Sequence, residues 1–202
     1  VLKVIGRGSL NSQLHAVRLR WLQMHQGIDR EHRVFDAILL GHISNSVSFF
    51  GSATLLVLAG LVGTLVNVNN LYRNTRDLKF SDQGMSQELF TLYFLQLTLI
   101  MAMCFFGFTY ALRKLAYTCA ESPEAKVMGE PAAVVLTEAV RSINAGIRGF
   151  YYAIAALFLF AGPHVAIGAT LVITALLFYR QLFSPTAMAI ARYVDVLKGT
   201  RG

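Results

Sequence analysis

Charged residues are scarce in this sequence, and the long apolar runs are free of them except near their ends. Only 14% of the 202 residues are charged and 55% are hydrophobic, whereas soluble domains carry about 25% charged residues. Ion-coupled transporters and proton pumps generally need an ionisable group in mid-membrane. The scarcity therefore argues against a proton-coupled mechanism.

Cysteine and histidine patterns are equally sparse. Two cysteines, Cys104 and Cys119, imply neither a disulfide framework nor metal spacing. His42 and His164 fall at opposite ends of predicted spans, so one metal or haem would not reach both. No phosphate-binding glycine loop or nucleophile elbow occurs. We predict no catalytic residue, no metal, no cofactor and no enzymatic activity, and an intramembrane enzyme is the least favoured alternative.

What the sequence does contain is four long apolar stretches. The stretch from Val47 to Val66 alone would extend about 30 Å as a helix, which matches the hydrocarbon core of a bilayer. The sequence predicts an all-α integral membrane helical bundle within residues 33–183. The predicted spans cover residues of about 37–66, 89–112, 147–162 and 165–180.

Connections between the spans differ in length and polarity. Residues 67–88 are polar and are predicted as a loop, and residues 118–146 as a second soluble segment whose helix opens at Pro131. The third span, from Ile147 to Ala161, is short unless Arg148 reaches the interface. Gly162 then predicts a tight reversal, so that the last two spans form an antiparallel hairpin.

Both ends of the chain are basic. In residues 1–32, the residues Leu14, Val17, Trp21 and Ile28 recur at helical spacing, which predicts an amphipathic helix on the cytoplasmic side with Arg18 and Arg20 off the apolar face. Asn11 or Ser12 would cap it. The helix would either lie on the inner leaflet or dock on the bundle as an ordinary cytosolic helix. Residues 184–202 form a basic tail, expected to be helical from Pro185.

The distribution of cations predicts the orientation. Arg73, Arg76 and Lys79 lie between the first two spans, and the other fifteen of the 18 lysines and arginines lie on the opposite side. Cations concentrate on the cytoplasmic side of membrane proteins. We predict a bacterial inner-membrane protein with both ends of the sequence cytoplasmic. The net charge of +7 is then explained by the lipid bilayer as partner, and no nucleic-acid partner is expected.

One face of the first predicted span is lined by small and polar residues. Its members share helical spacing and are Gly41, Ser44, Asn45, Ser48 and Ser52. Small residues allow helices to approach closely, and hydroxyls bond across such contacts. The alternative is a hydrated path lined by this face, with Phe49 and Phe50 as an apolar gate.

A second group of polar residues falls near the predicted cytoplasmic ends of the spans. Its members are Asp36, Arg113, Asn144, Arg148 and Tyr152. A buried carboxylate needs a partner, so Asp36 is expected to pair with Arg113 or Arg148. We interpret this polar network as an ion pair that sets helix register, and a gate or an anion site is the alternative.

Several stretches of the sequence resemble one known family. They are Arg18–Leu22, Arg33–Ala37, Leu40 with Gly41, Ser46–Thr54, Phe108 with Thr109, Leu112 with Arg113, Asn144–Ala153, and Tyr179 with Arg180. They resemble the DUF599 membrane family over most of residues 10–185. The resemblance implies a multi-helix inner-membrane protein, of a family found in bacteria and plants, without an established activity. Family members usually carry one more hydrophobic helix before the position of Ser9, which would make five spans and place the N-terminus outside.

Two functions from different classes remain open at this stage. The favoured hypothesis is a non-enzymatic subunit that self-associates or packs into a larger membrane complex, supported by the small-residue face. The alternative is an oligomeric channel or facilitator, because so few helices make a poor monomeric pore.

Overall fold

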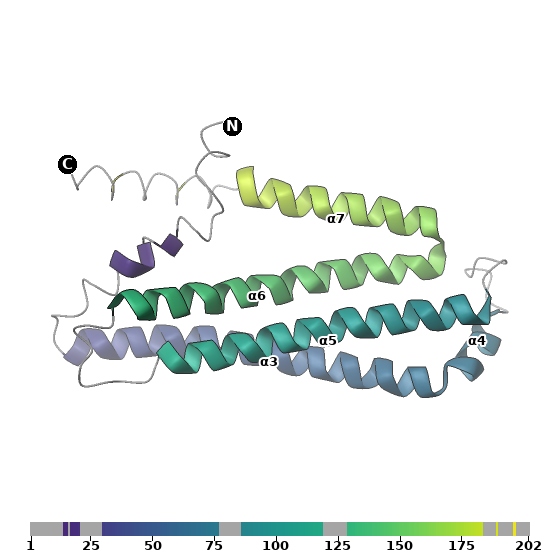
Figure 1. Ribbon diagram of the computed structural model, residues 1–202, viewed down its shortest axis with the longest axis horizontal. Helices are drawn as coiled ribbons and strands as arrows, with labels where there is room; N and C mark the ends of the chain where they lie inside the picture. Colours follow the sequence, from purple (N-terminus) through teal and green to yellow (C-terminus); the bar gives the residue numbers. More distant parts are fainter. Residues whose placement is uncertain are drawn as a thin grey trace. The chain divides into compact units, whose positions relative to one another are not determined.

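The computed structural model describes residues 14–15, 17–20, 30–76, 86–118, 129–183, 189 and 196, and all secondary structure among them is helical. The helices follow in the order α3 (Arg30–Val66), α4 (Val68–Arg76), α5 (Gln87–Thr118), α6 (Gly129–Leu157), the 3₁₀ helix η2 (Phe158–Ala161) and α7 (Pro163–Phe183), as labelled in Figure 1. The prediction of an all-α fold is confirmed. The predicted caps Asn11 and Ser12, the apolar positions Trp21 and Ile28, and most of the tail fall outside the described residues.

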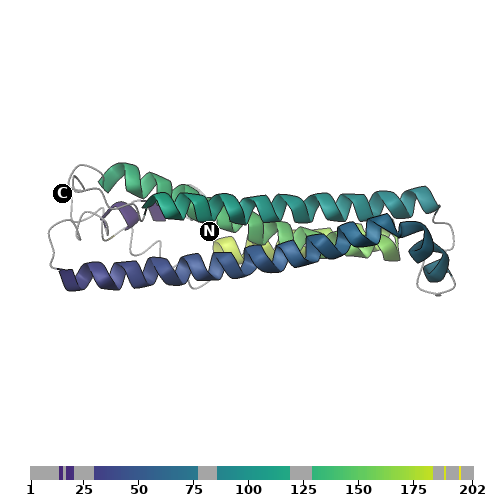
Figure 2. The ribbon, with the colours of Figure 1, turned by 90° about the horizontal axis from the view of Figure 1, so that it is seen from below.

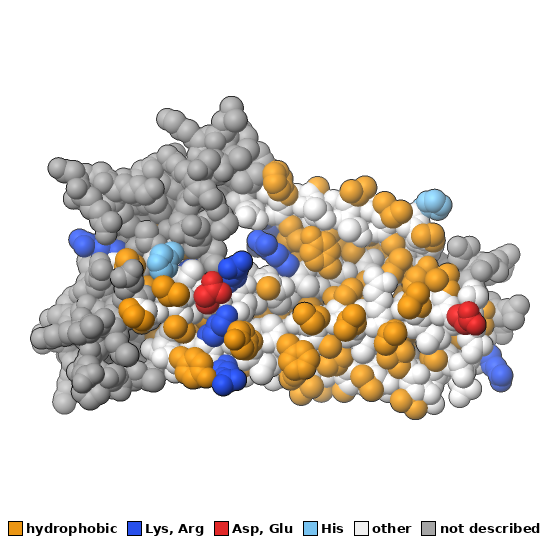
Figure 3. Space-filling view, in the orientation of Figure 1, with side chains coloured by type: hydrophobic (Ala, Val, Ile, Leu, Met, Phe, Trp, Pro, Cys, Tyr) orange, Lys and Arg blue, Asp and Glu red, His pale blue; other side chains and the backbone are white. Residues whose placement is uncertain are grey.

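Four helical stretches of the described chain are long and apolar enough to cross a membrane. They are Ile38–Val66, Gln87–Thr118, Pro131–Ala161 and Pro163–Gln181. Hydrophobic side chains are spread over the surface of these helices (Figure 3), where a water-soluble fold would show polar ones. A surface of this kind is stable in contact with lipid chains, so the chain is a multi-pass membrane protein.

Two compact units divide the chain, and each long helix contributes to both. The first comprises residues 1–48, 110–143 and 177–202, and the second comprises residues 49–109 and 144–176. The second unit contains the C-terminal halves of α3 and α6, the larger N-terminal part of α5, the hairpin to α7, and most of the buried apolar residues.

The predicted loop over residues 67–88 is wrong in its first half, because Val68–Arg76 forms the helix α4. Figure 2 shows this short helix just after the end of α3. Val68 is buried against Phe90, and Leu71 and Tyr72 pack on the same cluster. The three apolar residues of α4 recur at helical spacing, and contact with α5 stabilises a segment whose polar composition alone predicts a loop.

The helix predicted to open at Pro131 is present and begins at Gly129. Helix α6 is continuous from Gly129 to Leu157, so the predicted helix and the third predicted span are one element, and the apolar candidate span within it begins at Pro131. Ala133, Leu136 and Ala139 are buried on one face of its first half.

The predicted reversal at Gly162 is present and joins η2 to α7. Gly162 has φ 123° and ψ 152°, a backbone conformation that is strained for any residue with a Cβ atom. Its N–H donates to the carbonyl of Leu159, and its carbonyl accepts from the N–H of Ala166 (3.1 Å each). Pro163 follows as the first residue of α7, a position that needs no N–H donor. Figure 1 shows α6 and α7 folding back on each other at this turn.

The core of the second unit is built around Phe108 of α5, which has no exposed surface. Its ring stacks on Phe50 of α3 with centroids 5.8 Å apart, and lies 6.2 Å from the ring of Phe150 of α6. Glycines on α6 make this approach feasible. A Cβ at Gly146 would lie 2.8 Å from the Phe108 ring, and one at Gly149 would overlap the sulfur of Cys104.

Candidate functional site

Within the described part of the chain, the small-residue face of α3 is mostly exposed. Asn45, Ser48 and Ser52 are exposed and Ser44 is half-buried, and nothing lies within 4 Å of a Cβ built on Gly41. These five residues, which we call the serine face, are therefore available to a partner outside the chain. Whether they pack or line a path stays a prediction.

The buried face of α3 is the neighbouring one. Val47, Gly51 and Thr54 recur at helical spacing and are buried. Gly51 faces Phe108: a Cβ built on Gly51 would lie 3.7 Å from the Cβ of Phe108. The Thr54 hydroxyl donates to the carbonyl of Phe50 (2.6 Å), so that a fully buried polar group is satisfied within its own helix.

The two phenylalanines predicted as a gate have different surroundings. Phe50 stacks on the buried Phe108 but is still 40% exposed. Phe49 is 70% exposed and touches Phe50 edge-on, with centroids 5.9 Å apart. Phe50 thus already has a packing role within the chain, and Phe49 is the more exposed of the two rings.

The predicted polar network is placed only in part. The side chain of Asp36 lies outside what the structure describes, so its pairing stays a prediction. Arg113 is exposed and its Nε donates to the hydroxyl of Tyr117 in the same helix (2.8 Å). Asn144 and Arg148 are exposed on α6, and Tyr152 lines the pocket described below.

Lys114, which the sequence analysis did not single out, is the centre of a cluster between α5 and α6 in the first unit. Its Nζ donates to the Ser142 hydroxyl (3.1 Å) and to the backbone carbonyl of Glu138 (3.4 Å), and lies 3.8 Å from the Glu138 carboxylate. It also lies 4.6 Å from the centroid of the Tyr110 ring, a cation–π contact. The Lys114 side chain is only 19% exposed, so these contacts replace most of its hydration.

Lys114→Met is expected to lower stability by about 1–2 kcal/mol, because it removes charge-assisted hydrogen bonds and a cation–π contact while keeping the apolar stem. Arg141→Met is the matched control. Arg141 contacts the same Glu138 at 3.4 Å but is 73% exposed, and exposed ion pairs contribute less than about 1 kcal/mol. Thermal unfolding in detergent measures both variants. Equal melting temperatures for the Lys114→Met and Arg141→Met proteins would show that the contacts of Lys114 do not stabilise the packing of α5 on α6.

The N-terminal segment is attached to α6 through Thr137. Nη1 of Arg18 donates to the Thr137 hydroxyl, and Nδ1 of His15 lies equally close (3.1 Å each). Thr137 gives its single proton to the carbonyl of Ala133 (2.7 Å), so its hydroxyl accepts from both neighbours. Burial lowers the pKa of the Arg18 guanidinium, but an arginine remains charged in proteins. The contact supports a docked segment. Arg18 contacts α6, whereas the sequence analysis placed it off the apolar face of the N-terminal helix.

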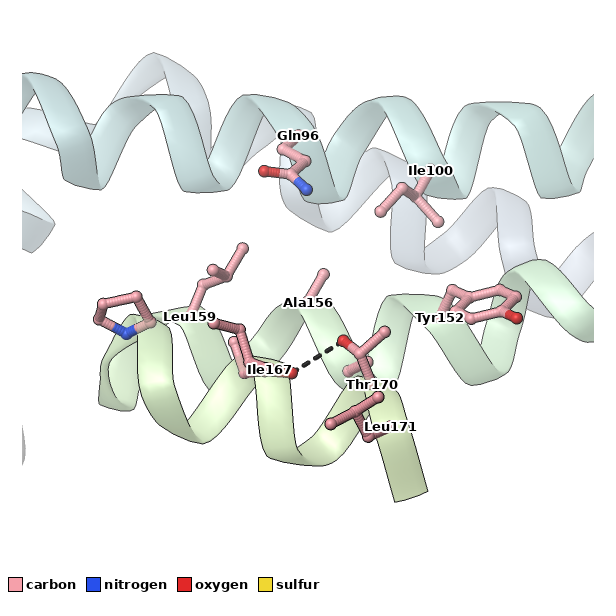
Figure 4. Close-up of a pocket in the computed structure, with 11 residues that line it drawn as sticks. Gln96, Ile100, Tyr152, Ala156, Leu159, Ile167, Thr170 and Leu171 are labelled. Atoms are coloured by element: carbon pink, nitrogen blue, oxygen red, sulfur yellow. Dashed lines mark hydrogen bonds between the residues drawn. The ribbon is translucent and has the colours of Figure 1, made fainter. Parts of the chain in front are cut away.

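An apolar pocket of about 450 Å³ lies among α5, α6 and α7 within the second unit. Figure 4 shows Gln96 and Ile100 of α5 directed toward Ala156 and toward Ile167 and Thr170 of the hairpin. The dashed line marks the hydroxyl of Thr170 donating to the carbonyl of Ala166 (2.8 Å). Gln96 has no hydrogen-bond partner among the described residues. Sequence reasoning missed Gln96, although a lone amide inside the apolar run of α5 was the available signal.

These features together define a multi-pass helical membrane protein whose described residues include an apolar pocket and an exposed polar face on α3. Its described residues hold no group of three or more His, Cys, Asp or Glu side chains that could bind a metal ion. The chain belongs to the DUF599 family, described as a protein of unknown function, whose model matches residues 2–186. No curated protein and no solved structure matches this chain.

Proposed function

We propose that this chain is a non-enzymatic membrane subunit that associates with a second copy of itself through the serine face of α3. One observation carries the proposal. Asn45, Ser48 and Ser52 are exposed on a membrane span and have no side-chain hydrogen-bond partner among the described residues. A polar group facing hydrocarbon without a partner is costly, and the contact with another helix removes that cost.

Other hydroxyls on the same helix show the contrast. Ser46, Thr54 and Thr64 donate to the carbonyl four residues earlier, at 2.9, 2.6 and 2.8 Å. This intrahelical bond is how a hydroxyl is satisfied in lipid. Ser48 and Ser52 do not form it, so their protons are free to bond across an interface. The open space at Gly41 supports close approach of a second helix, as in small-residue packing.

The proposal includes the orientation that the charges predict, with both ends of the sequence on the cytoplasmic side of the bacterial inner membrane. The asymmetry of lysine and arginine supports it. An oligomeric channel is the alternative, because a path through the centre of an oligomer would be lined by the same hydroxyls. Solute flux into liposomes separates a channel from a purely structural assembly.

The double variant Ser48→Leu with Ser52→Leu tests the interface. Native mass measurement in mild detergent should give a dimer or larger for the parent and at least a tenfold weaker association for the variant. Each interhelical hydrogen bond contributes about 0.6 kcal/mol, and the bulky leucines also hold the helices apart. Val57→Leu is the control, since Val57 is exposed on a different side of α3. A parent that is monomeric throughout, or a variant that associates like the parent, would contradict the proposal.

A further inference from the structure

Gln96 is a polar side chain on a membrane span. It lies on the candidate span Gln87–Thr118, between Leu95 and Leu97 in the apolar stretch of α5. Helix α5 has 32 residues and is about 48 Å long, longer than a hydrocarbon core of about 30 Å. No described residue hydrogen-bonds to it. An amide in such a place carries two donors and an acceptor, and leaving them unmade is unfavourable.

The pocket in front of Gln96 excludes a charged occupant. None of its lining residues is charged, so no opposite charge compensates for bringing a phosphate or an ammonium group into this pocket. A neutral group next to the Gln96 amide avoids that cost.

The walls fit an apolar molecule with few polar atoms. Ala155, Ala156 and Ala166 are buried, and their small side chains make the floor of a pocket of about 450 Å³, within the usual size range of small-molecule sites. The Thr170 hydroxyl has already given its proton to Ala166. Tyr152 lines one end of the pocket, and its hydroxyl points away from Gln96 and Ala156 (Figure 4). The Gln96 amide is thus the polar group directed into an otherwise apolar space.

We propose that this pocket binds a neutral lipid that carries a carbonyl or hydroxyl group on an apolar skeleton, with that oxygen hydrogen-bonded by the Gln96 amide. The hydrocarbon of the lipid covers the alanine floor and the exposed side chains of Ile167 and Leu171 at the mouth. The inference does not depend on the serine face, which lies on α3, a helix that does not line the pocket.

The test uses two variants and a matched control. Gln96→Leu removes the amide at an exposed position, and Ile167→Trp fills the mouth from a side chain that is 59% exposed, so neither disturbs the core. Leu99→Trp places the same bulk at an exposed position on α5 outside the pocket. The probes are a decyl-substituted benzoquinone, decylbenzene, which lacks the oxygens, and phosphatidylglycerol, which is charged. Thermal unfolding in detergent is measured with each probe.

A neutral ligand that binds only the folded protein raises the melting temperature. The benzoquinone should raise it by several degrees in the parent and in Leu99→Trp, and by less than half as much in Gln96→Leu and Ile167→Trp. Decylbenzene and phosphatidylglycerol should have weaker effects in the parent. Equal shifts with all three probes, or equal benzoquinone shifts in all four proteins, would overturn the proposal. So would a conversion of an oligomer to a monomer by Gln96→Leu in native mass measurements, because the occupant would then be a second copy of the chain.

Discussion

Gly146→Leu is expected to lower the melting temperature more than any other single change considered for this chain. A Cβ at position 146 would lie 2.8 Å from two atoms of the Phe108 ring, so that even alanine forces a displacement. The ring cannot yield easily, because it is fully buried and contacts Phe50 and Phe150. Overpacking of a core costs about 1–3 kcal/mol, and leucine adds further atoms in the same direction. We expect a loss of at least about 3 kcal/mol for leucine.

Gly168 supplies the control for this experiment. It lies in the interior of α7, and nothing is found within 4 Å of a Cβ built there. Removing a glycine from a helix interior gains up to about 1 kcal/mol of helix propensity. Gly168→Ala and Gly168→Leu should therefore unfold at or above the parent temperature in detergent. A Gly146→Leu protein that melts with the Gly168 variants would show that α5 and α6 do not approach closely at this point.

Phe108→Ala is expected to have the second largest effect, on the order of 3 kcal/mol, from the cavity it leaves and the aromatic contacts it removes. The neighbouring Phe106 is the control, because it is 64% exposed on the same helix. Phe106→Ala should change stability by less than about 1 kcal/mol, since its ring already faces lipid. Unfolding of both proteins in the same detergent gives the comparison, and equal losses would remove Phe108 from the core.

Combining Phe108→Ala with Gly146→Leu sharpens this test. The leucine occupies part of the volume that the ring leaves. The loss of unfolding free energy in the double variant should therefore be smaller than the sum of the two single losses by at least about 1 kcal/mol. Residues in direct contact show interaction energies of this size. Strict additivity would mean that the two positions do not touch.

Hydropathy was sufficient to predict the existence and order of the four spans. An apolar run of bilayer length is costly in water and has few alternatives to a helix. The same measure failed at α4, where Val68, Leu71 and Tyr72 pack in a cluster with Phe90 while adjacent residues are polar. Helix in such segments depends on contacts with another part of the chain, and these contacts are not visible in local composition.

The packed face of α3 could not be predicted for a related reason. Small residues occur on two sides of this helix, and the sequence does not say which side packs within the chain. The structure buries Gly51, where a Cβ would lie 3.7 Å from the Cβ of Phe108 in ordinary contact. Which helix supplies a large ring opposite a given glycine is a property of the assembled fold. The position of Gln96 could have been predicted from the sequence, since it is a lone amide between Leu95 and Leu97 in an apolar run.

The reversal at Gly162 has a consequence for how the last two spans enter the membrane. One residue separates η2 from α7, so the two helices have almost no polar connection to translocate. We expect them to insert as one helical pair, because an inversion of one helix would require its neighbour to move with it. A reporter or protease site inserted between Ala161 and Pro163 would separate two packed helices. The native connection, a single residue, is too short to bind an antibody or to enter the active site of a protease.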